Sequence, residues 1–362
     1  MAKNPAETPH AEKPTEIVVS HSKNAGIVDR RISVAPMMDW TDRHCRYFLR
    51  GFSPHVLLYT EMITAAAVLR GDRTRLLAFD TEEHPVALQL GGSDPRDLAA
   101  AARIGEEAGY DEINLNCGCP SDRVASGAFG ACLMLEPALV ADFVAAMSAA
   151  VRVPVTVKMR VGVVSAKGTA VARAVAGFDE RDYERLVHFI ASVRDAGCQA
   201  AIVHARKAVL GGLSPKDNRE IPPLCYEVVR RARLEFPTLP LVVNGGLRDA
   251  GAVQEALRWC DGVMLGREAY HRPHLLAELS EALYPGRDGV PSREAQLERM
   301  ERYAARELAS GGRLAAITRH MLGLYAGQPG ARDYRRTLSE GARASGAGPE
   351  LLRRVMPTEV LR

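Results

Sequence analysis

Short apolar runs alternate with longer amphipathic segments along most of the chain, beginning near residue 31. Eight of these runs have the length of a buried strand, and they span residues 32–37, 56–61, 86–90, 112–116, 153–159, 200–205, 239–245 and 261–266. Helix-like stretches lie between most of them, for example at 95–109, 136–151, 181–197, 222–236 and 250–259. Eight β–α repeats in about 250 residues predict an α/β fold, a (β/α)8 TIM barrel. A doubly wound sheet is the alternative, but no G-x-G-x-x-G motif follows the first strand.

The fourth apolar run, at residues 112–116, leads directly into the sequence CGCP. Its apolar residues alternate with Asn114 and Asn116, so the run predicts a half-buried strand with both asparagines on one face. The glycine and proline that follow end the strand and leave Cys119 on a loop. Loops on a rigid scaffold are where side chains meet ligands, which makes Cys119 a candidate catalytic residue.

Three roles for Cys119 remain open from these residues alone. An ordinary thiol has a pKa of about 8.5, so it is mostly protonated at neutral pH and can act as a general acid. As a nucleophile it would need a nearby base, and His204 could serve if the fold brings the two together. A lone loop cysteine can also be purely structural.

Nearly every predicted strand ends in a polar residue or a glycine. The strand-end residues are Pro36 and Met37, Glu61, Gln89, Asn116, Lys158 and Arg160, His204 and Arg206, Asn244 with Gly245 and Gly246, and Gly266 with Arg267. In (β/α)8 barrels the active site lies at the C-terminal ends of the strands. One polar strand end only marks the exit to solvent, but recurrence around the barrel predicts a shared site.

Two strand ends indicate what such a site binds. Lys158 alternates with valines that face the surrounding helices, so its ammonium would point into the barrel mouth and need an anionic or electron-rich partner, unless it reaches solvent. The turns at 244–246 and 265–267 lie where barrels bind phosphate through backbone amides, and Arg267 adds a cation. Tight turns alone would also explain these glycines. Two such turns favour a phosphate-bearing cofactor.

The last part of the chain has a helical period. After a linker from residue 284, apolar residues recur at helical spacing over 297–308 and 314–324, and a third segment places Arg332, Arg335 and Arg336 on one face. This pattern predicts a small all-helical domain after the barrel. From residue 291 onward, 13 arginines stand against 8 acidic residues, so this region carries +5 and the rest of the chain −2. The asymmetry suggests a polyanionic partner, although a solvated basic face has the same composition.

Two segments do not fit the repeat. Residues 164–182 interrupt it after the fifth strand with a run of small residues, which a helical insertion or a mobile loop would both explain. The first 30 residues mix Pro, Lys, Glu, His and Ser without an apolar core, which predicts a disordered tail. The predicted organisation is therefore a tail at 1–30, a barrel at 31–285 and a helical domain at 291–362.

Composition excludes some classes of protein but indicates no function. The chain has 362 residues, of which 47% are hydrophobic and 25% charged, as in globular proteins. No apolar run approaches a membrane span and no signal peptide precedes the first strand, so a cytoplasmic protein without a membrane contact is expected. Seven scattered cysteines predict reduced thiols rather than a disulfide framework, and their spacing completes no metal site.

Together the motifs resemble those of the tRNA-dihydrouridine synthase family, most closely its bacterial A-type branch. The matching segments are VAPMMDWTDRHCRYFLR (34–50), EHPVALQLGGSDP (83–95), YDEINLNCGCPSDRV (110–124), PVTVKMRVG (154–162), HARKAVLGGLSPKDNREIPPL (204–224), the NGG turn, DGVMLGREAY (261–270) and QPGARDYRRTLSE. The resemblance runs from about residue 31 to the C-terminus and implies an FMN-dependent barrel. Such an enzyme reduces the C5=C6 bond of uridines in the tRNA D loop, at about position 20/20a, with electrons from NADPH.

The resemblance also assigns roles to residues. It makes Cys119 the donor of a proton to C5 while flavin N5 delivers hydride to C6. It places flavin contacts at Pro36, Met37, Met38, Gln89, Lys158 and His204, and phosphate-end contacts at Asn244, Gly245, Gly246, Gly266 and Arg267. It places tRNA contacts at Asn116, Lys216, Arg219, Arg332 and Arg335, the last two within a tRNA-binding helical domain. A monomer without metal is expected, and the target uridine must be extruded into the barrel mouth.

Two features depart from the family pattern, and two other functions stay open. The segment 164–182 is longer than the usual loop, and Cys117 stands where an aliphatic residue is expected. An FMN barrel acting on a free pyrimidine or an enone would have no use for an arginine-faced helical domain. A non-catalytic tRNA-binding protein would have no use for Cys119 and the strand-end flavin residues.

Overall fold

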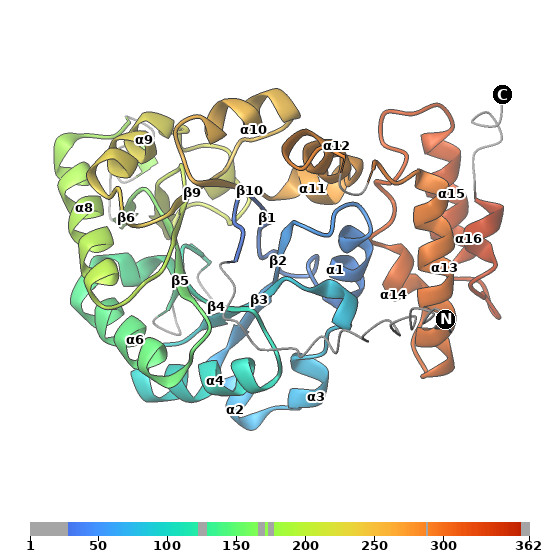
Figure 1. Ribbon diagram of the computed structural model, residues 1–362, viewed down its shortest axis with the longest axis horizontal. Helices are drawn as coiled ribbons and strands as arrows, with labels where there is room; N and C mark the ends of the chain where they lie inside the picture. Colours follow the sequence, from blue (N-terminus) through green and yellow to red (C-terminus); the bar gives the residue numbers. More distant parts are fainter. Residues whose placement is uncertain (1–27, 122–128, 166–170, 173–176, 287–288, 356–362) are drawn as a thin grey trace, which may run out of the picture.

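Eight parallel strands close into a barrel in the computed structural model, which describes residues 28–121, 129–165, 171–172, 177–286 and 289–355. Neighbouring strands follow the order β1-β10-β9-β7-β5-β4-β3-β2 (Figure 1). They are β1 (Ile32–Val34), β2 (Leu57–Thr64), β3 (Val86–Gly91), β4 (Glu112–Cys117), β5 (Val155–Arg160), β7 (Ala201–His204), β9 (Leu241–Asn244) and β10 (Gly262–Leu265). Each overlaps one of the eight predicted runs, so the predicted TIM barrel is confirmed. The second strand continues to Thr64, so Glu61 lies within it and not at its end as predicted.

Helices surround the barrel on its outer face (Figure 1). In chain order they are α1 (Arg43–Arg50), α2 (Ala65–Arg70), α3 (Arg73–Leu76), α4 (Pro95–Glu107), α6 (Pro137–Ala150), α8 (Glu180–Asp195), α9 (Tyr226–Glu235), α10 (Ala250–Leu257), α11 (Arg267–His271) and α12 (His274–Leu283). Short 3-10 helices η1 (Thr81–Glu83), η2 (Gly130–Leu135) and η3 (Asp217–Arg219) lie in the connections. The sequence marks their starts: Asp94 caps α4 by accepting from the backbone of Arg96 and Asp97, with Pro95 at the first position.

Strand alternation divides the core into two parts. On β4 the apolar residues Ile113, Leu115 and Cys117 belong to the large core between strands and helices. The polar residues between them face the inside of the barrel. A separate apolar cluster lines that inside, and it consists of Ala35, Leu57, Tyr59, Ala87, Ile202, Val242 and Met264. Cys117 is thus fully buried on the helix side, away from the barrel mouth.

Some boundaries differ from the predicted ones. The helix predicted at 222–236 begins only at Tyr226, because Pro222 and Pro223 each disfavour the helical conformation in the residue before them. A parallel two-stranded sheet was not predicted at all: β6 (Val163–Ser165) pairs with β8 (Ala208–Leu210). Its strands are three residues each, too short for a visible alternation. The sheet fastens the start of the 164–182 segment, of which residues 166–170 and 173–176 lie outside the described residues.

Four helices lie beside the barrel at the C-terminal side of the chain: α13 (Arg293–Ala309), α14 (Leu314–Thr318), α15 (Ala331–Gly341) and α16 (Leu351–Arg354) (Figure 1). The predicted all-helical region is confirmed, but its second helix is shorter than 314–324. Met321 and Leu324 are buried in turns rather than in a helix. At this point Gly323 packs against the backbone of Tyr270 and His271, and a Cβ there would lie 2.5 Å from a carbonyl oxygen.

Ion pairs and stacked rings join these helices to the barrel. Arg299 contacts Glu82 at 2.8 Å, Arg306 contacts Asp80 at 2.9 Å, and Arg319 contacts Asp42 at 2.6 Å. Tyr303 of α13 stacks on Tyr47 of α1 with ring centroids 4.0 Å apart. Much of the C-terminal arginine excess therefore serves the junction with the barrel, which reduces the share of it that can meet a polyanion.

The remaining expectations concern the chain ends and the cysteines. The tail predicted at 1–30 lies almost wholly outside the described residues. Within the part of the chain that the structure describes, no helix is long and apolar enough to cross a membrane. All seven cysteines are free thiols, as predicted.

Candidate active site

Cys119 sits on a turn that the end of β4 holds in place. The side-chain oxygen of Asn116 accepts hydrogen bonds from the backbone N–H groups of Gly118 at 3.1 Å and Cys119 at 3.0 Å. The Cys119 carbonyl accepts a bond of 2.9 Å from the backbone of Ala131. Cys119 itself is half-buried, and its backbone is held in a fixed frame. This geometry suits a group that must meet a substrate atom in one orientation.

The amides beside this turn are already hydrogen-bonded to one another. The Nδ2 of Asn116 donates to Gln89 at 2.8 Å, and the Nε2 of Gln89 donates to Asn114 at 2.8 Å. All three side chains are buried, Asn114 completely so. Gln89 and Asn116, expected at the flavin and the target nucleotide, are therefore also parts of the wall that supports Cys119.

A cluster of basic residues lines the adjacent strand ends. It comprises Lys158 and Arg160 on β5, His204 on β7, Arg206 after it, and Arg219 in η3. Lys158 has no ion-pair partner within the described residues. The guanidinium of Arg160, only 4% exposed, donates to the carbonyls of Gly118 and Asn218 rather than to a carboxylate. Uncompensated positive charge at one end of a barrel is a receptor for an anion.

The pKa values of this cluster reflect the crowding. Burial, and then Arg160, lower the pKa of Lys158 to about 7. Burial lowers the pKa of Arg160 to about 10, although the nearby Cys119 opposes this shift. Burial, with Arg160 and Lys158 next, lowers the pKa of His204 far below its usual value. His204 is thus neutral at pH 7, while Lys158 is poised to gain a proton when an anion arrives.

His204 and the glycine turn after β9 form a close-fitting surface. Gly245 has a φ of +105°, and a Cβ at this position would lie 3.0 Å from the Nε2 of His204. Gly246 has a φ of +74°, and a Cβ there would lie 2.7 Å from the Tyr226 hydroxyl. The buried Nδ1 of His204 has no hydrogen-bond partner in the described structure. An unsatisfied buried nitrogen beside side-chain-free backbone is what a bound polar ligand would complete.

The other expected cofactor residues lie at the ends of β1, β9 and β10. Pro36 and Met37 follow β1 and are partly buried, whereas Met38 is 57% exposed. Asn244 is buried, and its amide donates to the Met264 carbonyl at 2.7 Å. Gly266 lies against Met37. These residues surround the strand ends that also present Lys158 and His204.

Arg267 is not a free cation at this rim. Its guanidinium forms a 2.7 Å ion pair with Glu220, which follows η3. A phosphate at the 245–246 turn would therefore compete with Glu220 for Arg267. Sequence inspection cannot reveal this pair, because the two residues are far apart in the chain.

The residues expected at tRNA form two separate groups. Lys216 and Arg219 are exposed on the η3 segment at the barrel mouth. Arg332 and Arg335 are exposed on α15 in the C-terminal helices, and within the described residues neither has an ion-pair partner. Their neighbour Arg336 differs, because it contacts Asp333 at 3.0 Å. The structure thus leaves Arg332 and Arg335 of α15, both expected to contact tRNA, without acidic partners in the described residues.

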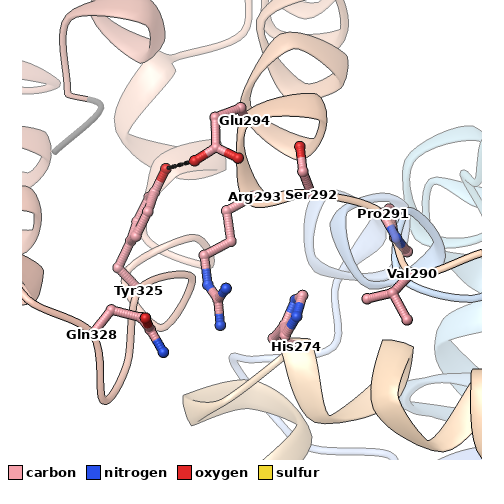
Figure 2. Close-up of a pocket in the computed structure, with 8 residues that line it drawn as sticks. All are labelled: His274, Val290, Pro291, Ser292, Arg293, Glu294, Tyr325 and Gln328. Carbon is pink, nitrogen blue, oxygen red and sulfur yellow. Dashed lines mark hydrogen bonds between the residues drawn. The ribbon is translucent and has the colours of Figure 1, made fainter. Parts of the chain in front are cut away.

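A cavity lies elsewhere, at the junction of barrel and helices. It has a volume of about 200 Å³, and its walls come from α12, the start of α13 and the turns after α14, including His274, Arg293, Tyr325 and Gln328 (Figure 2). The Tyr325 hydroxyl donates to Glu294 at 3.2 Å on one side of it (Figure 2). This cavity lines no strand end and contains none of the expected site residues.

Comparison with known proteins identifies the family of the chain. The family model described as dihydrouridine synthase (Dus) matches residues 33–359. The chain belongs to the dihydrouridine synthase family. A relative from Synechocystis sp. is 54% identical over 329 residues, which cover 91% of this chain and 94% of the relative. A relative from Pseudomonas syringae pv. tomato is 54% identical over 320 residues, covering 88% and 90%. One from Vibrio cholerae is 51% identical over 327 residues, covering 90% and 95%. All three are named tRNA-dihydrouridine(20/20a) synthase.

In this member of the family two groups of polar residues received no role from the sequence. Arg160 and Arg206 were recognised only as strand-end residues, and Arg160 proves to brace the Cys119 turn. Glu112, Asn114 and Thr156 face the barrel interior, where they form hydrogen bonds with one another or with neighbours. The sequence does show that these polar residues alternate with apolar residues on β4 and β5, and this pattern could have indicated that they face the barrel interior. The pattern within each strand does not reveal how β4 and β5 pair, and it is this pairing that brings their polar residues side by side.

Proposed function

We propose that this protein is an FMN-dependent tRNA-dihydrouridine synthase, which reduces uridines at about position 20/20a of the tRNA D loop with NADPH as reductant. The relatives' names supply the tRNA substrate and its position. The single observation in the structure that supports it best is the half-buried Cys119 held beside an uncompensated cationic strand-end cluster. A proton donor and an anion receptor at one barrel mouth are what this reaction needs.

The residues at the strand ends fit FMN. Gly245 and Gly246 have positive φ angles and carry no side chains, because a Cβ would collide with His204 or Tyr226, and such a turn can bind a phosphate through its backbone N–H groups. The unpartnered Nδ1 of His204 offers a polar contact. Lys158, which has no carboxylate partner in the described residues, would neutralise negative charge on the reduced ring system. Pro36, Met37, Met38, Gln89, Asn244, Gly266 and Arg267 complete the proposed cofactor residues.

Cys119 is the proposed proton donor. The chemistry that bound FMN would supply is a hydride for C6 of the uracil ring, with electrons from NADPH. The Cys119 Sγ–H then gives its proton to C5, the S–H bond breaks, and the thiolate is reprotonated from solvent. Asn116 fixes the backbone of Cys119, and Arg160 fixes the carbonyl of Gly118. The chain thus controls where the proton is delivered.

The tRNA would span both parts of the molecule. Lys216 and Arg219 at the barrel mouth would hold phosphates beside the extruded uridine, with Asn116 close to it. Arg332 and Arg335 on α15 would hold the tRNA backbone farther away, so we propose that residues 291–362 act as the tRNA-binding unit. Exposed arginines without acidic partners support this role.

Mapping of dihydrouridine tests the function directly. In tRNA from cells that lack the gene, dihydrouridine at position 20/20a is expected to disappear and to return when the gene is restored. The purified protein should be yellow and contain about one FMN per chain. Unchanged dihydrouridine, or a colourless protein that cannot be reconstituted with FMN, contradicts the proposal. Reduction of free uracil but not of tRNA would support the alternative FMN barrel instead.

FMN binding is expected to weaken as the pH rises from about 7 to 8.5, by about tenfold. Lys158 has a pKa of about 7 without ligand, so binding of an anion above this pH requires uptake of a proton. The ligand raises this pKa, and affinity is therefore greatest below pH 7 and decreases above it. Fluorescence titration of the apoprotein with FMN measures the effect. In Lys158→Met the affinity should be lower at pH 7 and the pH dependence should vanish; a persistent slope in this variant would remove Lys158 from the site.

A further inference from the structure

Polar side chains run through the barrel interior from its floor to the Cys119 turn. The inward-facing residues of β4 are Glu112, Asn114 and Asn116, and strands β3 and β5 flank them (Figure 1). In the register of these strands Asn114 lies opposite Gln89 on β3 and opposite Thr156 on β5. A barrel interior is normally filled with apolar side chains, so a continuous polar file within it is a costly feature unless every member is paired.

The lower end of the file is a buried carboxylate. Glu112 is fully buried, and Arg30 donates to its Oε2 from Nε at 2.9 Å and from Nη2 at 2.5 Å. Its other oxygen, Oε1, accepts from the Tyr59 hydroxyl at 2.5 Å and from the Thr156 hydroxyl at 2.6 Å. Burial, and then Glu112, raise the pKa of Tyr59 far above its usual value, so the phenol stays a donor. A carboxylate paired with arginine offers acceptors only.

This carboxylate fixes the direction of every bond above it. Because the Thr156 hydroxyl donates its hydrogen to Glu112, its oxygen is left to accept from the Nδ2 of Asn114 at 2.8 Å. The oxygen of Asn114 must then accept from Gln89, and the oxygen of Gln89 from Asn116. Each amide has its nitrogen toward the floor and its oxygen toward the mouth end of the file.

The upper end of the file, at Asn116, independently requires the same direction of hydrogen bonding. The Oδ1 of Asn116 accepts from the backbone N–H groups of both Gly118 and Cys119, and two N–H donors can be met only by oxygen. If any amide were reversed, two donors or two acceptors would face each other inside the barrel, where an unpaired polar group is expensive. Each side-chain amide has two possible orientations, which exchange its oxygen and nitrogen. The hydrogen bonds at both ends of the file require the same one.

We propose that Glu112, held by Arg30, is a positioning residue for Cys119, acting through Thr156, Asn114, Gln89 and Asn116. The inference rests on the proposed function, because it concerns delivery of the Cys119 proton to uridine. The file orients Asn116, and Asn116 holds the two N–H groups that set the turn carrying the thiol. The side-chain oxygen of Asn116 already accepts two hydrogen bonds, and one hydrogen of its Nδ2 is donated to Gln89. The second Nδ2 hydrogen remains for a substrate, and it is suited to a carbonyl oxygen of the pyrimidine.

Thr156→Val interrupts the hydrogen-bonded file, while the side chain keeps nearly the same shape. The variant leaves the Nδ2 of Asn114 without its acceptor and frees the amides above it to rotate. We expect the kcat for dihydrouridine formation on tRNA to fall about 30-fold, with little change in KM for tRNA and with FMN retained, because the residues proposed to hold phosphates are untouched while the amides that position the thiol lose their order. Thr156→Ser keeps the hydroxyl and should restore most of the rate.

Ser33→Ala is the matched control. Ser33 is also a buried hydroxyl in a barrel strand, 1% exposed and bonded to the Val263 carbonyl at 3.2 Å, but it lies outside the file. This variant should lose comparable stability in thermal unfolding and keep its kcat. Asn114→Ala interrupts the file one step higher and should reproduce the loss. Combined with Thr156→Val it should cost little more than either change alone, since both break one chain.

Thiol reactivity gives a readout that does not depend on turnover. Peptide-resolved alkylation with iodoacetamide should show a changed rate at Cys119 in Thr156→Val, and an unchanged rate at Cys225, which is also half-buried. If wild-type protein forms dihydrouridine but Thr156→Val and Asn114→Ala retain its kcat and its Cys119 alkylation rate, the positioning role is wrong and the proposed function stands. If wild-type protein forms none, the alkylation comparison still decides whether the file holds the turn.

Discussion

Replacement of Cys119 by alanine is expected to reduce dihydrouridine formation on tRNA by about 10³-fold, which lies within the range that a general acid contributes. FMN content and the oxidation of NADPH by the flavin should remain close to wild type. Hydride entry into the flavin needs no thiol, and Cys119 makes its described hydrogen bonds through its backbone, which alanine retains. Quantification of dihydrouridine in single-turnover reactions, alongside stopped-flow measurement of flavin reduction, separates the two half-reactions.

Cys225→Ala is the control for this experiment. Both cysteines are half-buried, so their truncation should affect stability similarly, but Cys225 has no proposed role in the reaction. It should leave dihydrouridine formation within about twofold of wild type. Full turnover of tRNA by Cys119→Ala would show that another group donates the proton. Loss of flavin reduction in the same variant would show that the turn at Cys119 serves the cofactor rather than proton delivery.

The double change Arg332→Ala and Arg335→Ala is expected to weaken tRNA binding about 50-fold at low salt and to leave flavin content unchanged. The two guanidinium groups have no acidic partners in the described structure, so their removal takes away phosphate contacts without exposing an unpaired carboxylate. The slope of log affinity against log salt concentration should become less steep by between one and two units. Fluorescence anisotropy with labelled tRNA at several salt concentrations measures both quantities.

A second double variant controls for net charge. Arg231 and Arg258 are exposed arginines on the barrel helices, paired with Glu180 at 2.7 Å and with Glu255 at 2.5 Å. Their joint replacement by alanine removes the same two charges but should change tRNA affinity much less and leave the salt slope close to wild type. Equal effects of the two double variants would reduce the role of α15 to general electrostatic attraction. No effect of the α15 variant would place the tRNA on another face.

Particular elements show how far the sequence reaches. The eight strands follow from alternation of apolar residues within short runs, a local property that survives without knowledge of neighbours. The C-terminal helices follow in the same way, except where Gly323 packs against the α11 backbone and the predicted second helix ends early at Thr318. The β6–β8 sheet was not predicted, because strands of three residues are too short to show an alternation of apolar and polar residues.

The candidate site divides along a similar line. Cys119 stands at a strand end whose position the sequence determines, and so do Lys158, His204 and the glycine turn at 245–246. The pairing of Arg267 with Glu220, and of the junction arginines with acidic residues of the barrel, depends on contacts between distant segments. Charge counting alone could not separate these paired arginines from the free Arg332 and Arg335.

By itself the sequence determined the barrel, the order of its strands and the residues at its mouth, since each depends on periodicity within a few residues and on the rule that parallel strands end on one side. Only the tertiary structure decided how those residues interact. Closure of the barrel sets the register that aligns Glu112, Thr156, Asn114 and Gln89, and hydrogen-bond direction then passes from a buried carboxylate to the backbone of Cys119. Such pairing is a property of neighbouring strands and cannot be read from any one of them.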